Sequence, residues 1–334
     1  MKAVVLVGGF GTRLRPLTLL TPKQMLPVID RPMIEHVIAG LAGHGIDTAV
    51  LALGYREDAF RAAYPDGRCA GVDLVYAVEP EPLDTAGAVR FAARAAGLDS
   101  TFVVVNGDVI TDLDVTALVD RHRASGAEAT IGLTPVDDPS RYGVVPTDAE
   151  GRVLGFVEKP PPGEAPTNWI NAGAYVMEPT LPDRVADGTR VSLEREIFPD
   201  IVTEGGLWAV RSDSYWVDAG TPATYLKVQL DLLDGKRGDP VPGVAESAII
   251  HPEATVERSV VMAGARIEAG AEVRDAAVQT GAVVGPGAHV EASIIGPRAR
   301  VGRGAVVLDE TVVGEGVVVA DGAHLHEARV AEVR

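Results

Sequence analysis

The C-terminal part of the chain repeats with a period of 17 residues, and this repeat limits the possible folds more than any other feature. Aliphatic residues form three columns, and successive columns lie six, five and six residues apart. The columns are Ile250, Ile267, Val284 and Val301; Val256, Val273, Val290 and Val307; and Val261, Val278, Ile295 and Val312. Such columns, with Gly and Ala at tight corners between them, are typical of a triangular parallel β-helix, here of four coils. A series of ordinary strands is the alternative.

The 334-residue chain, of which 46% is hydrophobic, is long enough for two domains with their own cores. Residues 235–240 are rich in turn formers, and they predict a linker over residues 235–246. We therefore expect a first domain over residues 1–234 and a β-helix domain over residues 247–334.

Charge and cysteine content exclude several classes of protein. The formal net charge of −17 leaves no basic surplus for a phosphate backbone, so nucleic acid is not an expected partner. The single cysteine, Cys69, excludes an intramolecular disulfide and suits a reducing compartment. The first strand begins at residue 2 without a charged leader and a hydrophobic signal core, so we expect a cytoplasmic protein with no membrane segment.

The first thirty residues predict an anion-binding turn. An apolar, β-branched run at residues 3–7 has the length of a strand. The turn after it contains three glycines and three cations, which are Gly8, Gly9, Gly11, Arg13, Arg15 and Lys23. Glycine lets backbone N–H groups approach phosphate oxygens, and the cations neutralise the phosphate charge. The order G-G-x-G differs from the dinucleotide-binding and P-loop patterns, and a plain turn after a buried strand is the alternative.

Strand and helix patterns alternate along the first half of the chain. Strands are predicted at 3–7, 48–53, 74–78 and 102–105, and helices at 33–43, 57–64 and 85–96. This order predicts a mainly parallel sheet with helices on both faces, and ligands bind at the carboxyl ends of such strands, where Gly8 and Asp108 fall. The pattern then becomes mixed, with strands at 130–134, 143–146, 153–158, 172–177, 207–210 and 215–218 and helices beginning at 192 and 225.

Six segments together resemble the signature of the sugar-1-phosphate nucleotidyltransferases, also called nucleotide-sugar pyrophosphorylases. They are GGFGTRLRPLT at 8–18, PKQMLPV at 22–28, NGD at 106–108, FVEKP at 156–160, NAG at 171–173 and WVDAGTP at 216–222. The resemblance implies an α/β, Rossmann-like, mixed but mainly parallel sheet, and the repeat resembles the left-handed hexapeptide-repeat β-helix. Over its length, notably SLEREIFP at 192–199, the chain is most similar to bacterial mannose-1-phosphate guanylyltransferases. KQ at 23–24 and DRPMI at 30–34 instead resemble the glucose-1-phosphate thymidylyltransferases.

The resemblance implies that a sugar 1-phosphate attacks the α-phosphate of a nucleoside triphosphate in line and releases pyrophosphate, assisted by Mg²⁺. The motifs favour GTP and mannose 1-phosphate as substrates and GDP-mannose as product. ATP, dTTP or UTP with glucose 1-phosphate or a cyclitol phosphate stays open, as does a non-catalytic regulatory subunit that binds nucleotide sugar. Acyltransferases also use a β-helix, with a catalytic histidine, and the candidates would be His251, His289, His324 and His326. We expect a homo-oligomer, either a dimer or a tetramer.

The resemblance also assigns roles to individual residues. The catalytic residues are Arg13 for the departing β- and γ-phosphates, Lys23 for the α-phosphate, and Asp108 with Asp218 for Mg²⁺. The nucleotide-binding residues are Leu6, Gly8, Gly9, Gly11, Thr12, Arg13, Lys23, Glu79, Asp84 and Thr85. The residues that bind the sugar phosphate are Gly143, Glu158, Lys159, Asn171 and Gly173, with Lys159 on the phosphate.

Base recognition depends on Glu79 and Asp84. The resemblance places Glu79 where a side chain reads the base, and a carboxylate accepts hydrogen bonds from both N1–H and N2–H₂ of guanine, which favours GTP. Adenine offers only its amino group at that edge. Asp84 stands where the family usually has glycine, and a carboxylate there would narrow the base pocket or repel a phosphate.

Overall fold

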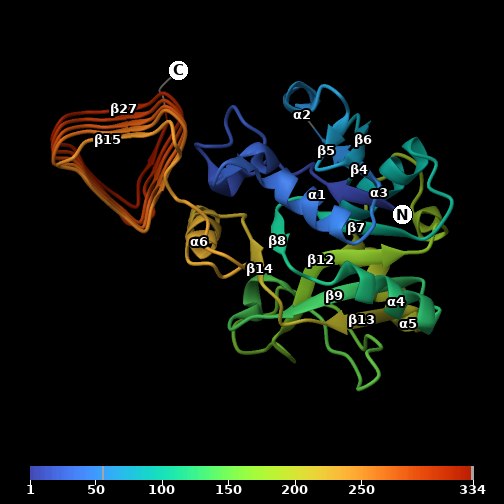
Figure 1. The fold of residues 1–334 in the computed structure, drawn as a ribbon. Coiled ribbons are helices and arrows are strands. Elements are labelled where there is room, and N and C mark those ends of the chain that lie inside the picture. The colour runs from blue at the N-terminus through green and yellow to red at the C-terminus, as the bar shows by residue number, and fades with distance from the viewer. Residues whose placement is uncertain (55, 332–334) are drawn as a thin grey trace. The chain divides into compact units, whose positions relative to one another are not determined.

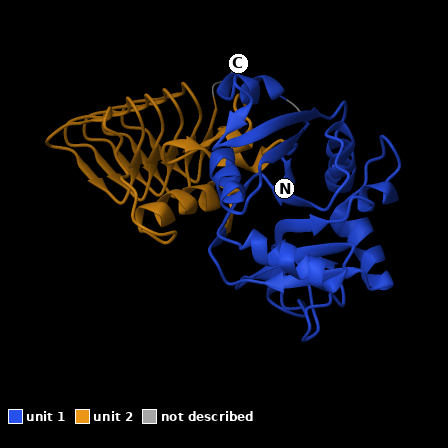
Figure 2. Cartoon of the chain, turned by 45° about the vertical axis from the view of Figure 1, so that its right-hand side comes forward, with its two compact units in different colours: residues 1–9, 34–216 blue, residues 10–33, 217–334 orange. Residues whose placement is uncertain are grey.

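The computed structural model describes residues 1–54 and 56–331 of the chain (Figure 1). The chain divides into two compact units, which Figure 2 colours separately. The first unit holds Met1–Gly9 and Ile34–Trp216, and the second holds Phe10–Met33 and Val217–Arg334. The opening glycine turn therefore belongs partly to each unit. The domain boundaries expected at residues 234 and 247 stay predictions.

The first unit is built on one ten-stranded mixed sheet. Four parallel strands form its centre, and their parallel arrangement is as predicted; their order is β7, β1, β4, β6. They are β1 (Lys2–Leu6), β4 (Thr48–Leu53), β6 (Val72–Val78) and β7 (Phe102–Asn106). The flanking strands are β5 (Arg68–Cys69), β9 (Ala129–Pro135), β10 (Gly143–Val144), β11 (Val157–Glu158), β12 (Trp169–Met177) and β13 (Leu207–Arg211). The strands predicted at 143–146 and 153–158 are wrong in length, because continuous strands cover only the two residues of β10 and the two of β11, and Val153 forms only an isolated bridge with Thr147.

Helices cover this sheet, and most of them match the sequence pattern. Those of the first unit are α1 (Met33–Gly43, whose first residue belongs to the second unit), α2 (Glu57–Ala63), α3 (Asp84–Ala95, which begins one residue before its prediction), α4 (Val115–Ser125) and α5 (Phe198–Glu204), with short helices η3 (Pro139–Arg141), η4 (Leu181–Arg184) and η5 (Leu193–Ile197). The helix expected from Ser192 begins as the π-helix η5 and continues as α5. Among residues 1–54 and 56–331, none of the helices has the length and apolar content needed to cross a membrane.

The central strands are aliphatic because both of their faces are covered. Val4 and Val5 are adjacent in β1, so their side chains point to opposite faces of the sheet, yet both are fully buried. Strands buried on both faces read as continuous hydrophobic runs rather than alternating ones. The polar residues of the opening loop therefore have to follow the strand instead of lying within it.

The second unit contains the triangular parallel β-helix predicted from the repeat. It has three parallel sheets of five strands each, and its stacking is consistent with the left-handed hexapeptide-repeat form. The sheets are β15, β18, β21, β24 and β27; β16, β19, β22, β25 and β28; and β17, β20, β23, β26 and β29, and they run from β15 (Ile249–Ile250) to β29 (Arg329–Val330). Fully buried aliphatic and alanine side chains fill the interior of the triangle.

Two details of the repeat differ from the sequence prediction. The β-helix has five coils instead of four, since Val319, Leu325 and Val330 extend the three columns. The assignment of Val312 to the third column is wrong, because Val313 pairs with Ile295 in that register. The cause is one extra residue at the preceding corner. Asp309 and Glu310 both adopt positive φ there, whereas the equivalent corner one coil earlier has a single such residue, Ala292.

The second unit also contains the opening segment and α6 (Pro222–Leu233), which follows β14 (Trp216–Asp218). The opening segment folds into η1 (Thr12–Leu14), η2 (Lys23–Met25), β2 (Pro27–Val28) and β3 (Arg31–Pro32). The carbonyl oxygen of Pro27 accepts hydrogen bonds from the Tyr225 hydroxyl and from the Gln229 amide, the latter at 2.9 Å. The Tyr225 hydroxyl accepts one from Gln279 of the β-helix at 2.9 Å. Through these bonds, α6 links the opening segment to the β-helix.

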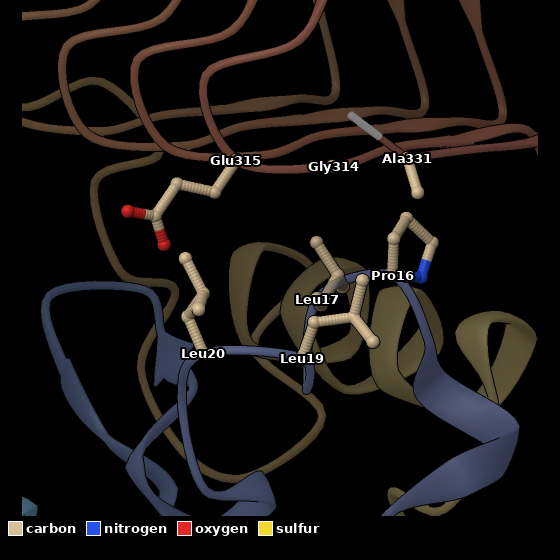
Figure 3. Close-up of a pocket in the computed structure, with 7 residues that line it drawn as sticks. All are labelled: Pro16, Leu17, Leu19, Leu20, Gly314, Glu315 and Ala331. Atoms are coloured by element: carbon tan, nitrogen blue, oxygen red, sulfur yellow. The ribbon is translucent and has the colours of Figure 1, made fainter. Parts of the chain in front are cut away.

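A cavity of about 330 Å³ lies elsewhere in the second unit, between the opening segment and the last coils of the β-helix (Figure 3). Its lining includes Pro16, Leu17, Leu19 and Leu20 from one side and Gly314 and Glu315 from the other. The Glu315 carboxylate is engaged by Arg298, so the remaining wall is largely aliphatic. Pro16, the first of the lining residues along the chain, lies three residues after Arg13.

Candidate active site

Two neighbouring parallel strands bring part of the predicted site to one edge of the first unit. Leu6, the last residue of β1, is in register with Asn106, the last residue of β7. Gly8 and Asp108 each follow two residues later, so the start of the glycine turn and this carboxylate lie at the same carboxyl edge of the sheet. Asp108 is half-buried. The geometry matches the expected position of a ligand site in a parallel sheet.

Gly107 allows these two strand ends to approach closely. Its N–H donates to the Leu6 carbonyl oxygen at 2.9 Å. A Cβ at this position would lie 2.6 Å from Cγ1 of Val7 and 3.0 Å from that carbonyl oxygen. Since one of these atoms is backbone, a side-chain rotation cannot relieve the conflict.

We expect Gly107→Ala to destabilise the protein by about 1–3 kcal/mol, the usual cost of overpacking a core. It should also lower turnover, because it separates the ends of β1 and β7. Urea denaturation and pyrophosphate release measure the two effects. Gly40→Ala is the control, since the space around Gly40 is open and alanine favours its helix. Equal stability of the two variants would contradict this account of the strand ends.

Glu79 follows β6 at the same edge and points into the site. The side chain is buried, with 6% of the residue exposed. Oε2 accepts a hydrogen bond from the Leu83 N–H at 3.0 Å, while Oε1 is buried without a hydrogen-bond partner. Oε1 lies 3.5 Å from the position that a Cβ of Gly8 would occupy. Burial raises the pKa of this carboxyl above its ordinary value. A buried acceptor without a donor is costly unless a ligand supplies one.

Asp84 opens α3 with a backbone in the left-handed region, at φ 61°. Its Oδ1 accepts from the Thr85 N–H at 2.9 Å. Its Oδ2 lies 2.5 Å from the Arg195 guanidinium and 3.9 Å from that of Arg190. The positive φ explains why glycine suits this position. The carboxylate is compensated by two arginines, which removes the physical reason for expecting it to repel a phosphate.

A hairpin in the first unit brings together three residues of the predicted sugar-phosphate set. Gly143 of β10 pairs with Glu158 of β11, and Glu158 Oε2 lies 3.0 Å from where a Cβ of Gly143 would be. Lys159 follows with a positive φ of 50°, and its ammonium is 3.1 Å from Glu158 Oε1. Backbone strain of this kind at a non-glycine residue is common at ligand sites.

Asn171 and Gly173 lie at an irregularity in β12. The register of β12 against β9 shifts between Asn171 and Tyr175, and Gly173 takes a positive φ of 73°. Asn171 Oδ1 accepts from the Gly173 N–H at 2.8 Å. A Cβ on Gly173 would lie 2.5 Å from Nδ2 of Asn106, so this bulge touches the end of β7. The structure thus places the predicted residues Asn171 and Gly173 beside the segment that carries Asp108.

The second unit gathers Arg13, Lys23 and Asp218. Asp218 ends β14, and its carboxylate lies 3.9 Å from the Arg13 guanidinium and 3.8 Å from the Lys23 ammonium. Lys23 is buried, with 7% of its side chain exposed, whereas 64% of the Arg13 side chain is exposed. The loop between them is held by Thr18, whose hydroxyl donates to the Gly11 carbonyl oxygen at 2.8 Å. A guanidinium and an ammonium group are the side chains that bind phosphate oxygens through charge-assisted hydrogen bonds, so this cluster is of the type that binds a polyanion.

The carboxylates at the strand ends are also suited to a hard cation. Within the parts of the chain that the structure describes, no group of three or more His, Cys, Asp and Glu side chains is arranged to hold a metal ion. Mg²⁺ in nucleotide enzymes is usually held by one or two carboxylates together with substrate phosphates and waters. The donor type of Asp108 and Asp218 fits that ion, and its binding would need oxygens from the substrate.

The sequence analysis missed Asn106, Tyr175, Glu194 and Arg195, which contact predicted residues in the first unit. The only signal for the last two is the segment 192–199, which carries part of the resemblance. Nothing in the local pattern distinguishes Tyr175 from an ordinary strand tyrosine.

Two family models match the sequence. The nucleotidyl transferase model matches residues 2–235, and the GMPPB C-terminal domain model matches residues 240–334. A mannose-1-phosphate guanylyltransferase of Mycobacterium tuberculosis is 38% identical over 82% of this chain and 83% of its own length. A probable mannose-1-phosphate guanylyltransferase 1 of Oryza sativa subsp. japonica is 38% identical over 96% of this chain and 93% of its own length.

Two solved structures are similar to about two thirds of this chain. HddC from Yersinia pseudotuberculosis, complexed with GMP-PN, matches with a TM-score of 0.59 and 28% identity, over 68% of this chain and 97% of that one. A putative glucose-1-phosphate thymidylyltransferase from Bacillus anthracis matches with a TM-score of 0.60 and 26% identity, over 69% of this chain and 94% of that one. The family match, the relatives and the sheet that carries the glycine turn agree: the chain belongs to the nucleotidyl transferase family.

Proposed function

We propose that the protein is a mannose-1-phosphate guanylyltransferase, which joins GTP and mannose 1-phosphate to give GDP-mannose and pyrophosphate. The relatives of that name, which match most of the chain, support the reaction. The observation that carries the choice of base is Glu79 Oε1, a buried acceptor without a partner that faces Gly8. Guanine presents two donors to one carboxylate, and the GMP-PN complex of the Yersinia relative agrees with guanine nucleotide binding in the family.

The chemistry needs little acid–base catalysis, because the attacking phosphate oxygen is already an anion. The barrier comes from bringing two polyanions together and from charge that builds on the leaving pyrophosphate. We assign the β- and γ-phosphates to Arg13 and the α-phosphate to Lys23, while the amides of Gly8, Gly9 and Gly11 face the triphosphate. Leu6, Thr12, Asp84 and Thr85 complete the proposed nucleotide site.

On the sugar side, Lys159 holds the phosphate of the attacking substrate. The sugar hydroxyls are bound by Gly143, Glu158, Asn171 and Gly173. Backbone amides donate hydrogen bonds to these hydroxyls, and the Glu158 carboxylate accepts hydrogen bonds from them. Before substrate binds, the ion pair holds the Lys159 ammonium beside the Glu158 carboxylate. A phosphate dianion would replace that carboxylate as the partner of Lys159.

The family resemblance implies Mg²⁺, and Asp108 and Asp218 are the residues that would hold it. A bound Mg²⁺ would supply positive charge that stabilises the phosphoryl transfer transition state. The role of Asp218 beside Arg13 and Lys23 does not depend on the ion, since it orients both cations.

The alternatives have less support. A regulatory subunit that only binds nucleotide sugar has no need of a full charged set, yet Arg13, Lys23, Asp108, Lys159 and Asp218 are all present. An acyltransferase would use a β-helix histidine as a base. His289 is instead flanked by Glu272 and Glu291, and His326 by Asp309, as in surface ion pairs. We further propose a cytoplasmic homo-oligomer, a dimer or a tetramer.

Pyrophosphate release tests the proposal directly. The purified protein is assayed with Mg²⁺ and each of GTP, ATP, dTTP and UTP, paired with mannose 1-phosphate, glucose 1-phosphate and a cyclitol phosphate. We expect the highest kcat/KM for GTP with mannose 1-phosphate. A higher value for another pair would replace the substrates, and no release with any pair would refute the enzymatic function.

A further inference from the structure

The π-helix η5 (Leu193–Ile197) presents a carboxylate that the proposed mechanism does not use. π-Helices are rare and often occur at functional sites. Ser192 caps η5, since its hydroxyl accepts from the Arg195 N–H at 3.3 Å and its own N–H donates to Glu196 at 2.9 Å. Glu196 thus serves the helix itself. Glu194 instead makes hydrogen bonds to α3 and β12.

On the nucleotide side, Glu194 holds Thr85, the second residue of α3. The Thr85 hydroxyl donates to Glu194 Oε2 at 2.7 Å and accepts from the Leu193 N–H at 2.8 Å. Ser192 also donates to Oε2, at 2.9 Å. The donor and acceptor roles of the threonine hydroxyl are both satisfied by the η5 segment, which fixes its rotamer and the start of α3.

On the sugar side, Glu194 is linked to Asn171 through Tyr175. The Tyr175 hydroxyl lies 3.4 Å from Glu194 Oε1, to which it donates, and it accepts from Nδ2 of Asn171 at 2.8 Å. Tyr175 is fully buried, and burial together with the charge of Glu194 raises its pKa well above the ordinary value. The hydroxyl therefore stays protonated and donates a hydrogen bond to the carboxylate.

The direction of these bonds orients the amide of Asn171. Glu194 only accepts, so Tyr175 must donate to it and accept from the asparagine nitrogen. Oδ1 then receives the Gly173 N–H at 2.8 Å. One N–H and one oxygen lone pair of the amide stay available, which is the donor and acceptor combination that neighbouring sugar hydroxyls require.

We propose that Glu194 is a positioning residue that sets both halves of the substrate site, holding Thr85 for the nucleotide and orienting Asn171, through Tyr175, for the sugar. This inference rests on the proposed function, because that function assigns Thr85 and Asn171 to the two substrates. A single carboxylate then couples the geometry of the two sides. A purely structural role would affect stability without affecting substrate affinity.

Steady-state kinetics of Glu194→Gln test this role, since glutamine keeps the shape but removes the purely accepting character. We expect KM to rise about tenfold for both substrates, in line with the loss of charged hydrogen bonds. Tyr175→Phe should raise KM for the sugar phosphate alone, and Thr85→Val should raise it for the triphosphate alone. Adding Tyr175→Phe to Glu194→Gln should change the sugar KM little further, because both act on one chain of bonds.

Glu196→Gln is the matched control, two residues along the same π-helix. It should lower the midpoint of urea unfolding while both KM values stay at the wild-type level. Unchanged KM values in Glu194→Gln, or fully additive effects with Tyr175→Phe, would overturn the proposal. For each variant, KM is divided by the wild-type KM, both measured with the substrate pair that the wild type uses best. Turnover by the wild type tests the proposed function, whereas the KM ratio of Glu194→Gln tests the role of Glu194.

Discussion

Lys23→Met should reduce kcat by about a thousandfold, or ~4 kcal/mol in the activation barrier, while the protein stays folded. Methionine keeps the length and apolar character of the lysine stem, which is buried. The variant therefore removes little except the ammonium group, which lies 3.8 Å from Asp218. In our assignment that charge stabilises the α-phosphate when its negative charge increases, and water cannot replace it in a buried position.

The measurement is pyrophosphate release at saturating substrate, with thermal denaturation to check the fold. Lys2→Met is the control, because Lys2 is an exposed lysine at the start of β1. It should keep wild-type turnover. A Lys23→Met protein that unfolds at the wild-type temperature and turns over within tenfold of the wild-type rate would show that Lys23 has no role in phosphoryl transfer.

Glu79→Gln should weaken the preference for GTP over ATP by about a hundredfold in kcat/KM. A glutamine amide has a single oxygen. If that oxygen keeps accepting from the Leu83 N–H, the amide presents its NH₂ group, a donor, at the place where the carboxylate presents Oε1 to the two donors of guanine. The ratio of kcat/KM for the two triphosphates measures the effect. Glu81→Gln, which changes an exposed carboxylate two residues away, should leave the ratio unchanged. An unchanged ratio in Glu79→Gln would refute base reading by this residue.

Because the pKa of Glu79 is raised, Glu79→Gln should increase the stability of the protein at neutral pH although it impairs base recognition. Because burial raises this pKa, the folded protein holds a proton on Glu79 at pH values where the unfolded chain has lost it. Its contribution to stability is therefore complete below the ordinary pKa of glutamate and is lost as pH rises through the folded pKa. At neutral pH Glu79→Gln should be more stable than the wild type, and this difference should shrink toward acid pH in urea titrations. The wild-type KM for GTP should rise on acidification, as the carboxyl becomes protonated.

The β-helix could be predicted because each coil obeys the same spacing rule, so that three aliphatic columns reinforce one another. The single register error has a clear cause. Both Val312 and Val313 are aliphatic, and only the backbone reveals that Asp309 and Glu310 together form the corner before them. A pattern of residue types cannot distinguish two adjacent valines when the insertion itself lies in a polar turn.

The central sheet was predictable for a related reason, because strands buried on both faces have an unbroken apolar run. The contacts around the candidate site were not. Thr85 and Glu194 are 109 residues apart in the chain, and Asp84 and Arg195 are 111 apart. Sequence reasoning identified Asp84 as an unusual residue but had no means of finding the arginine that compensates it. Which oxygen of Glu79 lacks a partner is likewise a property of the folded backbone.

The bonds that join Gln279, Tyr225 and Pro27 bear on how freely this enzyme can be divided or recombined. Pro27 lies four residues after Lys23, so a β-helix side chain supports, through one tyrosine, the loop that carries a proposed catalytic cation. A chimera that receives its β-helix from another relative inherits a working loop only if the donor supplies an equivalent of Gln279 on that coil. The C-terminal domain is thus not freely exchangeable between family members, and a chimera has to keep the hydrogen bond between Gln279 and Tyr225.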